Sequence, residues 1–112
     1  MAAIERLTIG ILGGLGPYAT VDIFRKILDK TPAKIDQDHL HILIDNYPQI
    51  PDRSAALKGC GPSPIPAMVE AANRLCGAGA DFILIPCNTA HAFLPELRPH
   101  LKIPVLSITD AT

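Results

Sequence analysis

The chain has 112 residues, of which 48% are apolar and 19% charged, and its 10 basic and 11 acidic side chains leave a formal net charge of -1. This length suits one compact domain, so we expect a single unit over residues 1–112. A balanced charge without a basic block argues against nucleic acid and anionic membrane as partners.

The sequence patterns indicate a compartment and argue against disulfides and a metal site. No apolar run approaches the ~20 residues of a membrane span, and residues 1–7 contain no secretion-signal core, so we expect a cytoplasmic protein. The three cysteines have no CxxC spacing, and no histidine has a carboxylate or thiol partner at a metal-ligand spacing. We therefore expect neither disulfides nor a metal site.

Strand and helix patterns alternate along the first part of the chain. Residues 7–12 form an apolar run typical of a buried strand, and the glycine-rich turn 13–17 follows it. Residues 19–30 carry an apolar stripe that begins at Val21 and is spaced by three and four, which predicts an amphipathic helix. A second strand is predicted over residues 39–44.

The alternation continues to the end of the chain. Residues 45–64 carry four prolines and are predicted to form a long loop, a feature that is often functional in a compact domain. The remaining predicted elements are a helix over 65–76, a strand over 81–86, a helix over 90–101 with Pro95 in its first turn or at a kink, and a strand over 104–108. This order predicts an α/β fold, a four-stranded parallel sheet with helices on both faces, in which ligands bind at the carboxyl ends of the strands.

Cys87 comes directly after the strand predicted over 81–86, where Asn88 and Thr89 favour the start of a helix. The free N–H groups and partial positive charge of a helix start stabilise anions such as a thiolate. A free cysteine has a pKa of about 8.5, and such surroundings can bring it to roughly 3.5–7.5. Cys87 is therefore a candidate base or nucleophile; the alternative is a small apolar side chain of the core.

The glycine turn allows three interpretations. Gly14 to Ala19 fits G-x-G-x-x-[GA] after a strand, a pattern found at dinucleotide pyrophosphate sites. Pro17 within the turn disfavours that site, as does the lack of an acidic residue ending a second strand about 20 residues further on. The turn is otherwise a tight bend whose glycines allow positive φ, or a backbone cradle for a carboxylate, and the residues alone leave both open.

Three sequence blocks adjoin the predicted strand ends: IGILGGLGP at 9–17 followed by Ala19-Thr20, NYPQIPDR at 46–53, and GADF at 79–82 leading into PCNTAH at 86–91. Together, and in this order over essentially the whole chain, they resemble the aspartate racemase branch of the aspartate/glutamate racemases. The resemblance implies an amino-acid racemase that uses no pyridoxal phosphate or other cofactor. It also implies two similar α/β halves with the active site in the cleft between them.

The resemblance assigns roles to Cys87, as one of two catalytic cysteines, and to Asn88, Thr89 and Arg53, as groups that hold the substrate's carboxylates. Inverting an α-carbon requires a base on one face and an acid on the other, so a thiolate and a thiol would flank the carbon. Arg53 offers a planar fork that favours an acidic amino acid; the alternative is a solvated arginine on a loop. His91 either contacts the thiol over one helical turn or is a structural histidine.

The sequence departs from the family at Thr112, where the chain stops just after the fourth predicted strand and before a second half with a partner cysteine. We therefore expect the N-terminal half of a racemase, with incomplete two-base catalysis by itself. Three hypotheses follow: Cys87 exchanges one proton only, two copies pair as an active homodimer, or the chain is a non-catalytic dicarboxylate-binding or interaction module. A homo-oligomer is expected because loss of a covering half exposes apolar surface.

Overall fold

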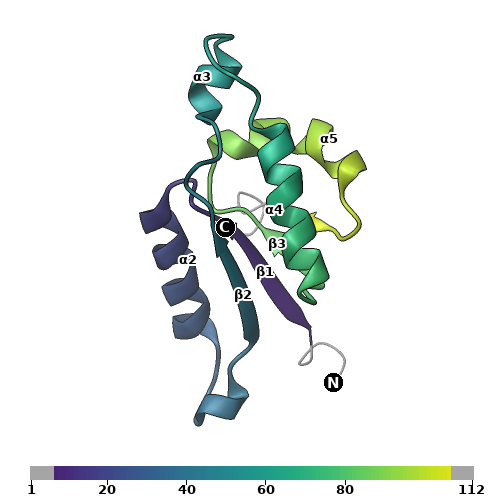
Figure 1. Ribbon diagram of the computed structural model, residues 1–112. Helices are drawn as coiled ribbons and strands as arrows, with labels where there is room; N and C mark the ends of the chain where they lie inside the picture. Colours follow the sequence, from purple (N-terminus) through teal and green to yellow (C-terminus); the bar gives the residue numbers. More distant parts are fainter. Residues whose placement is uncertain (1–6, 107–112) are drawn as a thin grey trace.

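Four parallel strands form the central sheet of the computed structural model, which describes residues 7–106 (Figure 1). Their order across the sheet is β2-β1-β3-β4. The strands are β1 (Thr8–Gly13), β2 (His41–Asn46), β3 (Phe82–Leu84) and β4 (Val105–Leu106). The sheet confirms the predicted α/β class, and the predicted strands lie within about two residues of those observed, apart from residues 107 and 108, which are outside the described part of the chain.

The connections between the strands are helical. The α-helices are α2 (Pro17–Lys30), α3 (Arg53–Leu57), α4 (Ile65–Gly77) and α5 (Leu94–Leu97), and the 3-10 helices are η1 (Asp36–Asp38), η2 (Thr89–Phe93) and η3 (Arg98–His100). Within residues 7–106, no helix combines the length and the apolar character that a membrane crossing requires.

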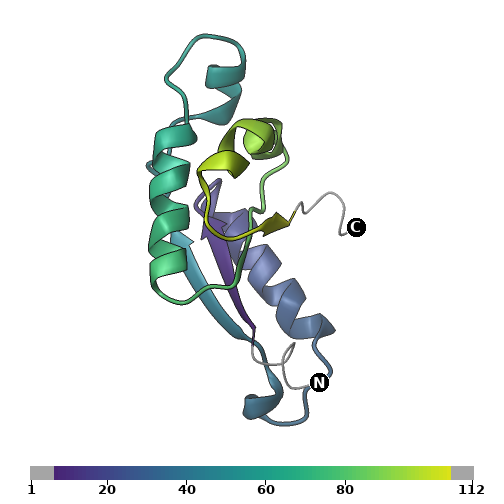
Figure 2. The same cartoon turned by 90° about the vertical axis from the view of Figure 1, so that its right-hand side faces the viewer.

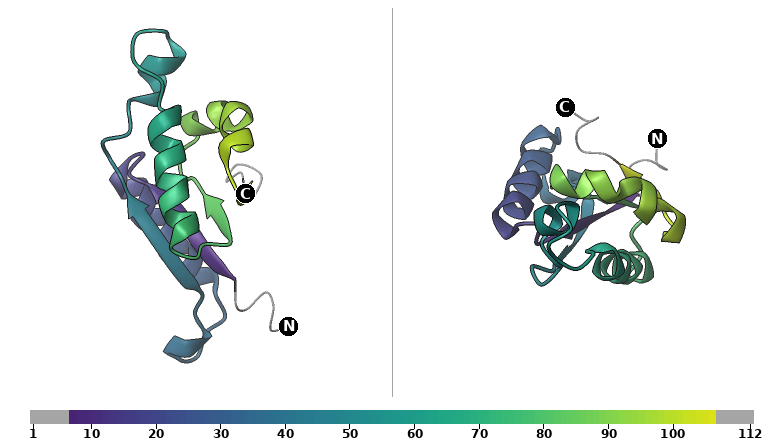
Figure 3. Two further views of the ribbon diagram at one scale, coloured as in Figure 1. Left: turned by 45° about the vertical axis from the view of Figure 1, so that its right-hand side comes forward. Right: turned by 90° about the horizontal axis from the view of Figure 1, so that it is seen from above.

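Helix α2 lies on one face of the sheet and α4 on the other (Figures 1 and 3). Successive positions of a strand face opposite sides, and the two glycines of β1 distinguish the faces. A Cβ at Gly10 would lie 2.8 Å from the Cβ of Ala80 and 3.4 Å from that of Leu75 in α4. A Cβ at Gly13 would lie 2.5 Å from the Oγ1 of Thr20 in α2. Helices therefore cover both faces, as predicted.

The hydrophobic core lies mainly between the sheet and α4, which packs against β1, β2, β3 and α5. Helix α2 contributes much less: Thr20 is its one buried residue, and Val21, the start of the predicted apolar stripe, is 64% exposed. The core cluster consists of Leu12, Leu15, Ile50, Ile65, Met68, Ala71, Ala72, Leu75, Ala80, Ile83, Ile85, Ala90, Leu94, Leu97 and Val105. The sheet is thus well covered on the α4 face and partly covered on the α2 face.

Two segments differ from the sequence expectations. The predicted loop over 45–64 contains the short helix α3, which begins at Arg53 because the Asp52 side chain accepts a hydrogen bond from the Ser54 N–H. The helix predicted over 90–101 is instead η2, α5 and η3 in succession. Pro95 lies in the first turn of α5, where its missing N–H costs no hydrogen bond.

Candidate functional site at the carboxyl edge of the sheet

The candidate site lies where the strand order reverses. The chain leaves β1 to form β2 on one side and returns to form β3 on the other, so β1 and β3 are neighbours whose connections diverge. In sheets of this kind, ligands bind in the crevice beyond the carboxyl ends of such strands. The last pair in register is Ile11 with Leu84, after which β1 continues to Gly13 and the other chain segment leaves the sheet toward Cys87. The glycine turn and Cys87 therefore both follow strands that end at the carboxyl edge of the sheet, as the sequence predicted.

Cys87 is half-buried and follows β3 after two further residues. Its N–H donates to the carbonyl of Ile85 at 2.9 Å, and the Nε2–H of His91 donates to the same carbonyl at 3.2 Å. These two bonds fix the backbone path into the cysteine, which supports the structural interpretation of His91. One side of Cys87 packs against the core cluster, and the residue also lines an open groove. Cys87 therefore lies between the core and the open groove.

The segment after Cys87 forms a 3-10 helix and not the start of an α-helix, so the predicted helix start was wrong. Asn88 is the N-cap residue of η2, but its side chain makes no capping hydrogen bond, and Thr89 is the first residue of η2. A five-residue 3-10 helix has a smaller dipole than the predicted α-helix, because the helix dipole is the sum of the dipoles of its aligned peptide units. Asn88 is exposed and Thr89 half-buried. Both residues therefore come directly after Cys87 in the chain, but neither side chain caps the helix.

The glycine turn is held tightly between α2 and the end of β2. Gly14 has φ +94°, and a Cβ there would lie 2.4 Å from the carbonyl carbon of Tyr47. The Gly14 N–H donates to the buried Oγ1 of Thr20 at 2.9 Å, while the Tyr47 N–H donates to the Gly13 carbonyl at 3.1 Å. This packing favours the tight-turn interpretation. Thr20 was not predicted as the anchor of the turn, although a hydroxyl side chain in the first turn of the following helix indicates such a role.

Arg53 lies at the start of α3, which packs against η2 and so comes close to the segment after Cys87. Its Nη1 donates to the carbonyls of Ile50 at 3.3 Å and Pro51 at 3.2 Å. Its Nε is buried without a hydrogen-bond partner among the described residues. Arg53 is thus half-buried and anchored, not a freely solvated loop side chain, and it forms no ion pair within residues 7–106.

A second arginine connects α4 to the end of β2. The Nε of Arg74 lies 2.9 Å from a carboxylate oxygen of Asp45, its Nη1 lies 2.8 Å from Glu70, and its guanidinium carbon lies 4.7 Å from the ring centre of Tyr47. Hydrogen bonding to Glu70, and secondarily to Asp45, raises the pKa of Arg74 above its ordinary value. The contact holds Tyr47, and with it the loop opposite the glycine turn, against α4.

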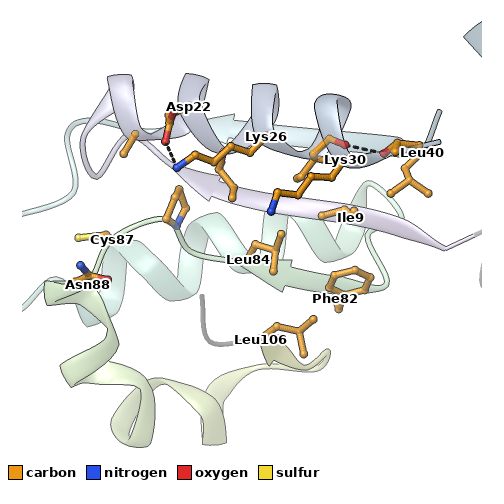
Figure 4. A pocket seen from close by; sticks show the side chains of 15 residues that line it. Ile9, Asp22, Lys26, Lys30, Leu40, Phe82, Leu84, Cys87, Asn88 and Leu106 are labelled. Atoms are coloured by element: carbon orange, nitrogen blue, oxygen red, sulfur yellow. Dashed lines mark hydrogen bonds and ion pairs between the residues drawn. The ribbon is translucent and has the colours of Figure 1, made fainter. Parts of the chain in front are cut away.

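An open groove of about 600 Å³ runs along the sheet between α2 and β3–β4, and we call it the α2–β3 groove (Figure 4). Its volume falls in the range of small-molecule sites. Its floor and wall are apolar, and Cys87 and Asn88 lie together at one end. The apolar side chains that line the groove are Ile9, Ala19, Ile23, Ile27, Leu40, Phe82, Leu84, Pro86 and Leu106.

Within residues 7–106, no group of three or more His, Cys, Asp or Glu side chains is placed so that it could hold a metal ion. Cys60 is exposed and Cys76 half-buried, and both are free thiols. The structure therefore brings together Cys87, Asn88 and Thr89, with the helix of Arg53 beside them.

Comparison with known proteins identifies the family to which this chain is similar. Residues 12–112 match the Asp/Glu/hydantoin racemase family. The broad-specificity amino-acid racemase RacX of Bacillus subtilis is 33% identical over 113 aligned positions, which cover 93% of this chain and 47% of that protein. Among solved structures, Picrophilus torridus aspartate racemase superposes with a TM-score of 0.85 at 38% identity, covering 93% of this chain and 44% of that one.

A more distant structure, an aspartate racemase homologue from Pyrococcus horikoshii, shares the fold with a TM-score of 0.73 at 24% identity. Again 93% of this chain is matched, against 46% of the other protein. The chain thus spans about half the length of the relatives it matches.

Proposed function

Because the chain belongs to the Asp/Glu/hydantoin racemase family, we propose that its Cys87 thiol transfers a proton at the α-carbon of an acidic amino acid. The observation that carries this proposal is the position of Cys87, half-buried after β3 at the point where the strand order reverses. The residue lines the open groove, while the core on its other side limits the water that reaches it.

The proposed chemistry needs two faces of the substrate. As a thiolate, Cys87 removes the α-hydrogen as a proton and becomes a thiol, and the electron pair stays on the substrate as a carbanion next to the carboxylate. Returning the proton from Cys87 restores the same enantiomer, whereas inversion needs an acid on the opposite face. Cys87 accounts for one of these two groups. Neither pyridoxal phosphate nor a metal has a part in the proposed step.

Donors near the carboxylates stabilise the developing charge. Nη1 of Arg53 is occupied by two backbone carbonyls, which leaves Nη2 and the unpartnered Nε on one edge of the planar fork. That edge suits a carboxylate bound through two parallel hydrogen bonds, once the contacts that bury Nε open. Asn88 and Thr89, immediately after the cysteine, offer an amide and a hydroxyl to the second carboxylate. We expect this reaction to take place in the cytoplasm.

Hydrogen exchange at the α-carbon tests the proposal. The purified chain is incubated separately with L-aspartate and D-aspartate in deuterated water, and α-deuterium is followed by NMR. We expect deuterium to enter one enantiomer with retention of configuration, because a single thiol serves a single face. Cys87→Ala should abolish the exchange, and Cys76→Ala, which changes a half-buried cysteine in α4, should leave it unchanged.

Two other results point to the alternatives. Full racemisation by the chain, lost in Cys87→Ala, indicates an active homodimer in which a second copy supplies the opposite face. Aspartate binding that is equal in wild type and Cys87→Ala, with no deuterium entering the α-position, indicates a non-catalytic dicarboxylate-binding module and contradicts the proposed proton transfer.

A further inference from the structure

Arg74 contacts the chain segment that leads from β2 to Arg53. Its Nε donates to a carboxylate oxygen of Asp45 at 2.9 Å, and its guanidinium carbon lies 4.7 Å from the ring centre of Tyr47. Figure 2 shows α4 beside β2, with α3, which begins at Arg53, beyond the first turn of α4. The side chain of Arg74 therefore holds the first residues of this segment from the α4 side.

Tyr47 is held on two sides, by its backbone and by its ring. Its N–H donates to the Gly13 carbonyl at 3.1 Å, and its carbonyl carbon would lie 2.4 Å from a Cβ at Gly14. A guanidinium over an aromatic ring is attracted by the electron density of the ring face, so the Arg74 contact favours one orientation of the ring. The glycine turn and α4 therefore fix the position of Tyr47 together.

A tight turn connects Tyr47 to the carbonyls that hold Arg53. The Ile50 N–H donates to the Tyr47 carbonyl at 3.4 Å, which closes the turn over residues 47–50. The carbonyls of Ile50 and Pro51 in turn accept hydrogen bonds from the Arg53 Nη1, at 3.3 and 3.2 Å. The position of Tyr47 therefore affects the position of the two acceptors that orient the guanidinium.

We propose that Arg74 and Tyr47 are positioning residues for Arg53, because their stacked side chains fix the turn whose carbonyls orient its guanidinium. The inference rests on the proposed function, in which Arg53 binds a substrate carboxylate. The Nε of Arg53 is buried without a hydrogen-bond partner among residues 7–106, so a shift of the turn changes whether Nε and Nη2 present one edge to a carboxylate. Arg74 itself is not a ligand of the substrate in this proposal.

The positioning contact is separate from the proposed proton transfer. Cys87 follows β3, whereas Tyr47 follows β2, and these two strands lie on opposite sides of β1. Loss of the Arg74 contact should therefore weaken aspartate binding without changing the rate of hydrogen exchange at saturating aspartate. A residue needed only for folding would instead lower the amount of active protein and leave the KM unchanged.

Exchange of the Arg53 Nε–H with water, measured by heteronuclear NMR, tests the positioning without a substrate. Arg74→Met removes the guanidinium, and Tyr47→Leu removes the ring. The matched controls are Glu70→Gln, which weakens the ion pair at the Nη1 of Arg74 and leaves the stacked contact in place, and Tyr47→Phe, which keeps the ring. The Nε–H signal of Arg53 is assigned by its loss in Arg53→Lys.

We expect Arg74→Met and Tyr47→Leu to accelerate this exchange by at least about fivefold, because the buried Nε–H reaches water only when the turn opens. Both variants should also raise the KM for aspartate in the deuterium-exchange assay by about fivefold, with the rate at saturation unchanged. Glu70→Gln and Tyr47→Phe should match wild type in both measurements. The double variant should show no more than the effect of Arg74→Met, because the two residues act through one contact.

Exchange of the Arg53 Nε–H at the wild-type rate in Arg74→Met would overturn the proposal. Equal acceleration in Glu70→Gln would also overturn it, because the effect would then be a general loosening of α4. If the wild-type chain neither binds aspartate nor exchanges its α-hydrogen, the proposed function is wrong, and the NMR comparison still decides whether Arg74 orients Arg53. Faster Nε–H exchange with unchanged aspartate binding would support the positioning contact and contradict the role of Arg53 in the proposed function.

Discussion

Gly14 fixes the path of the backbone between β1 and α2. It is in the left-handed region, and its α-carbon faces the backbone of Tyr47 so closely that a Cβ would lie 2.4 Å from a carbonyl carbon. Gly79 is also left-handed, at φ +108°, but has open space where a Cβ would be. Alanine substitutions at the two glycines therefore separate the free-energy cost of the left-handed conformation from the cost of the close contact with Tyr47.

We expect Gly14→Ala to lower the free energy of unfolding by ~3 kcal/mol, the sum of a left-handed alanine and a forced backbone shift. Gly79→Ala should cost about 1–2 kcal/mol, for the conformation alone. Urea denaturation of both variants measures the difference. Equal losses would mean that the contact with Tyr47 does not constrain the turn.

In the proposed function, Arg53 selects a negatively charged substrate by binding one of its carboxylates. Replacing it by lysine keeps the charge but removes the planar edge formed by Nε and Nη2, so we expect Arg53→Lys to weaken aspartate binding by about tenfold. Arg25→Lys, on an exposed face of α2, is the control and should bind as wild type. An NMR titration measures both; identical affinities for Arg53→Lys and wild type would remove Arg53 from the site.

At the scale of elements, Arg74 joins α4 to the carboxyl end of β2 through Asp45 and Tyr47. Its side chain is 46% exposed, so solvent screens much of the ion-pair energy. We expect Arg74→Lys to lower the free energy of unfolding by about 1 kcal/mol, mainly through loss of stacking and of the Nε hydrogen bond.

The exposed Asp22–Lys26 pair on α2 provides the comparison. Lys26→Met should change stability by less than about 0.5 kcal/mol, because such surface pairs contribute little. Chemical denaturation measures the free energy of unfolding of both variants. A decrease for Lys26→Met as large as that for Arg74→Lys would argue against a specific contribution from the Tyr47 contact.

The elements that the sequence predicted well are those with a long apolar pattern. The α4 helix was predicted within one residue because its buried side chains recur at helical spacing over the full length of the element. Helix α3 has five residues, too few for periodicity to be recognised, and depends on the Asp52 cap and on packing against η2. Short helices of this kind are set by tertiary contacts that a single sequence does not display.

At the scale of the whole molecule, the parallel sheet and the position of Cys87 at its carboxyl edge followed from the order of the elements. The geometry of Arg53 did not, since its hydrogen bonds run to carbonyls of a loop whose path was not predictable. The α2–β3 groove was also beyond sequence reasoning, because the pattern of β3 indicates a buried strand without indicating which face the described chain leaves open.

The proposed function depends on one spatial relation, that an acidic amino acid binds directly against the sulfur of Cys87. Alkylation of the native chain by iodoacetamide, followed separately at Cys87 and at the exposed Cys60, tests this relation with an internal reference in the same molecule. Saturating aspartate should slow alkylation of Cys87 several-fold and leave that of Cys60 unchanged, and asparagine should protect less. If aspartate binds and Cys87 is alkylated at the same rate with and without it, the substrate does not lie against this sulfur and the proposed role of Cys87 is wrong.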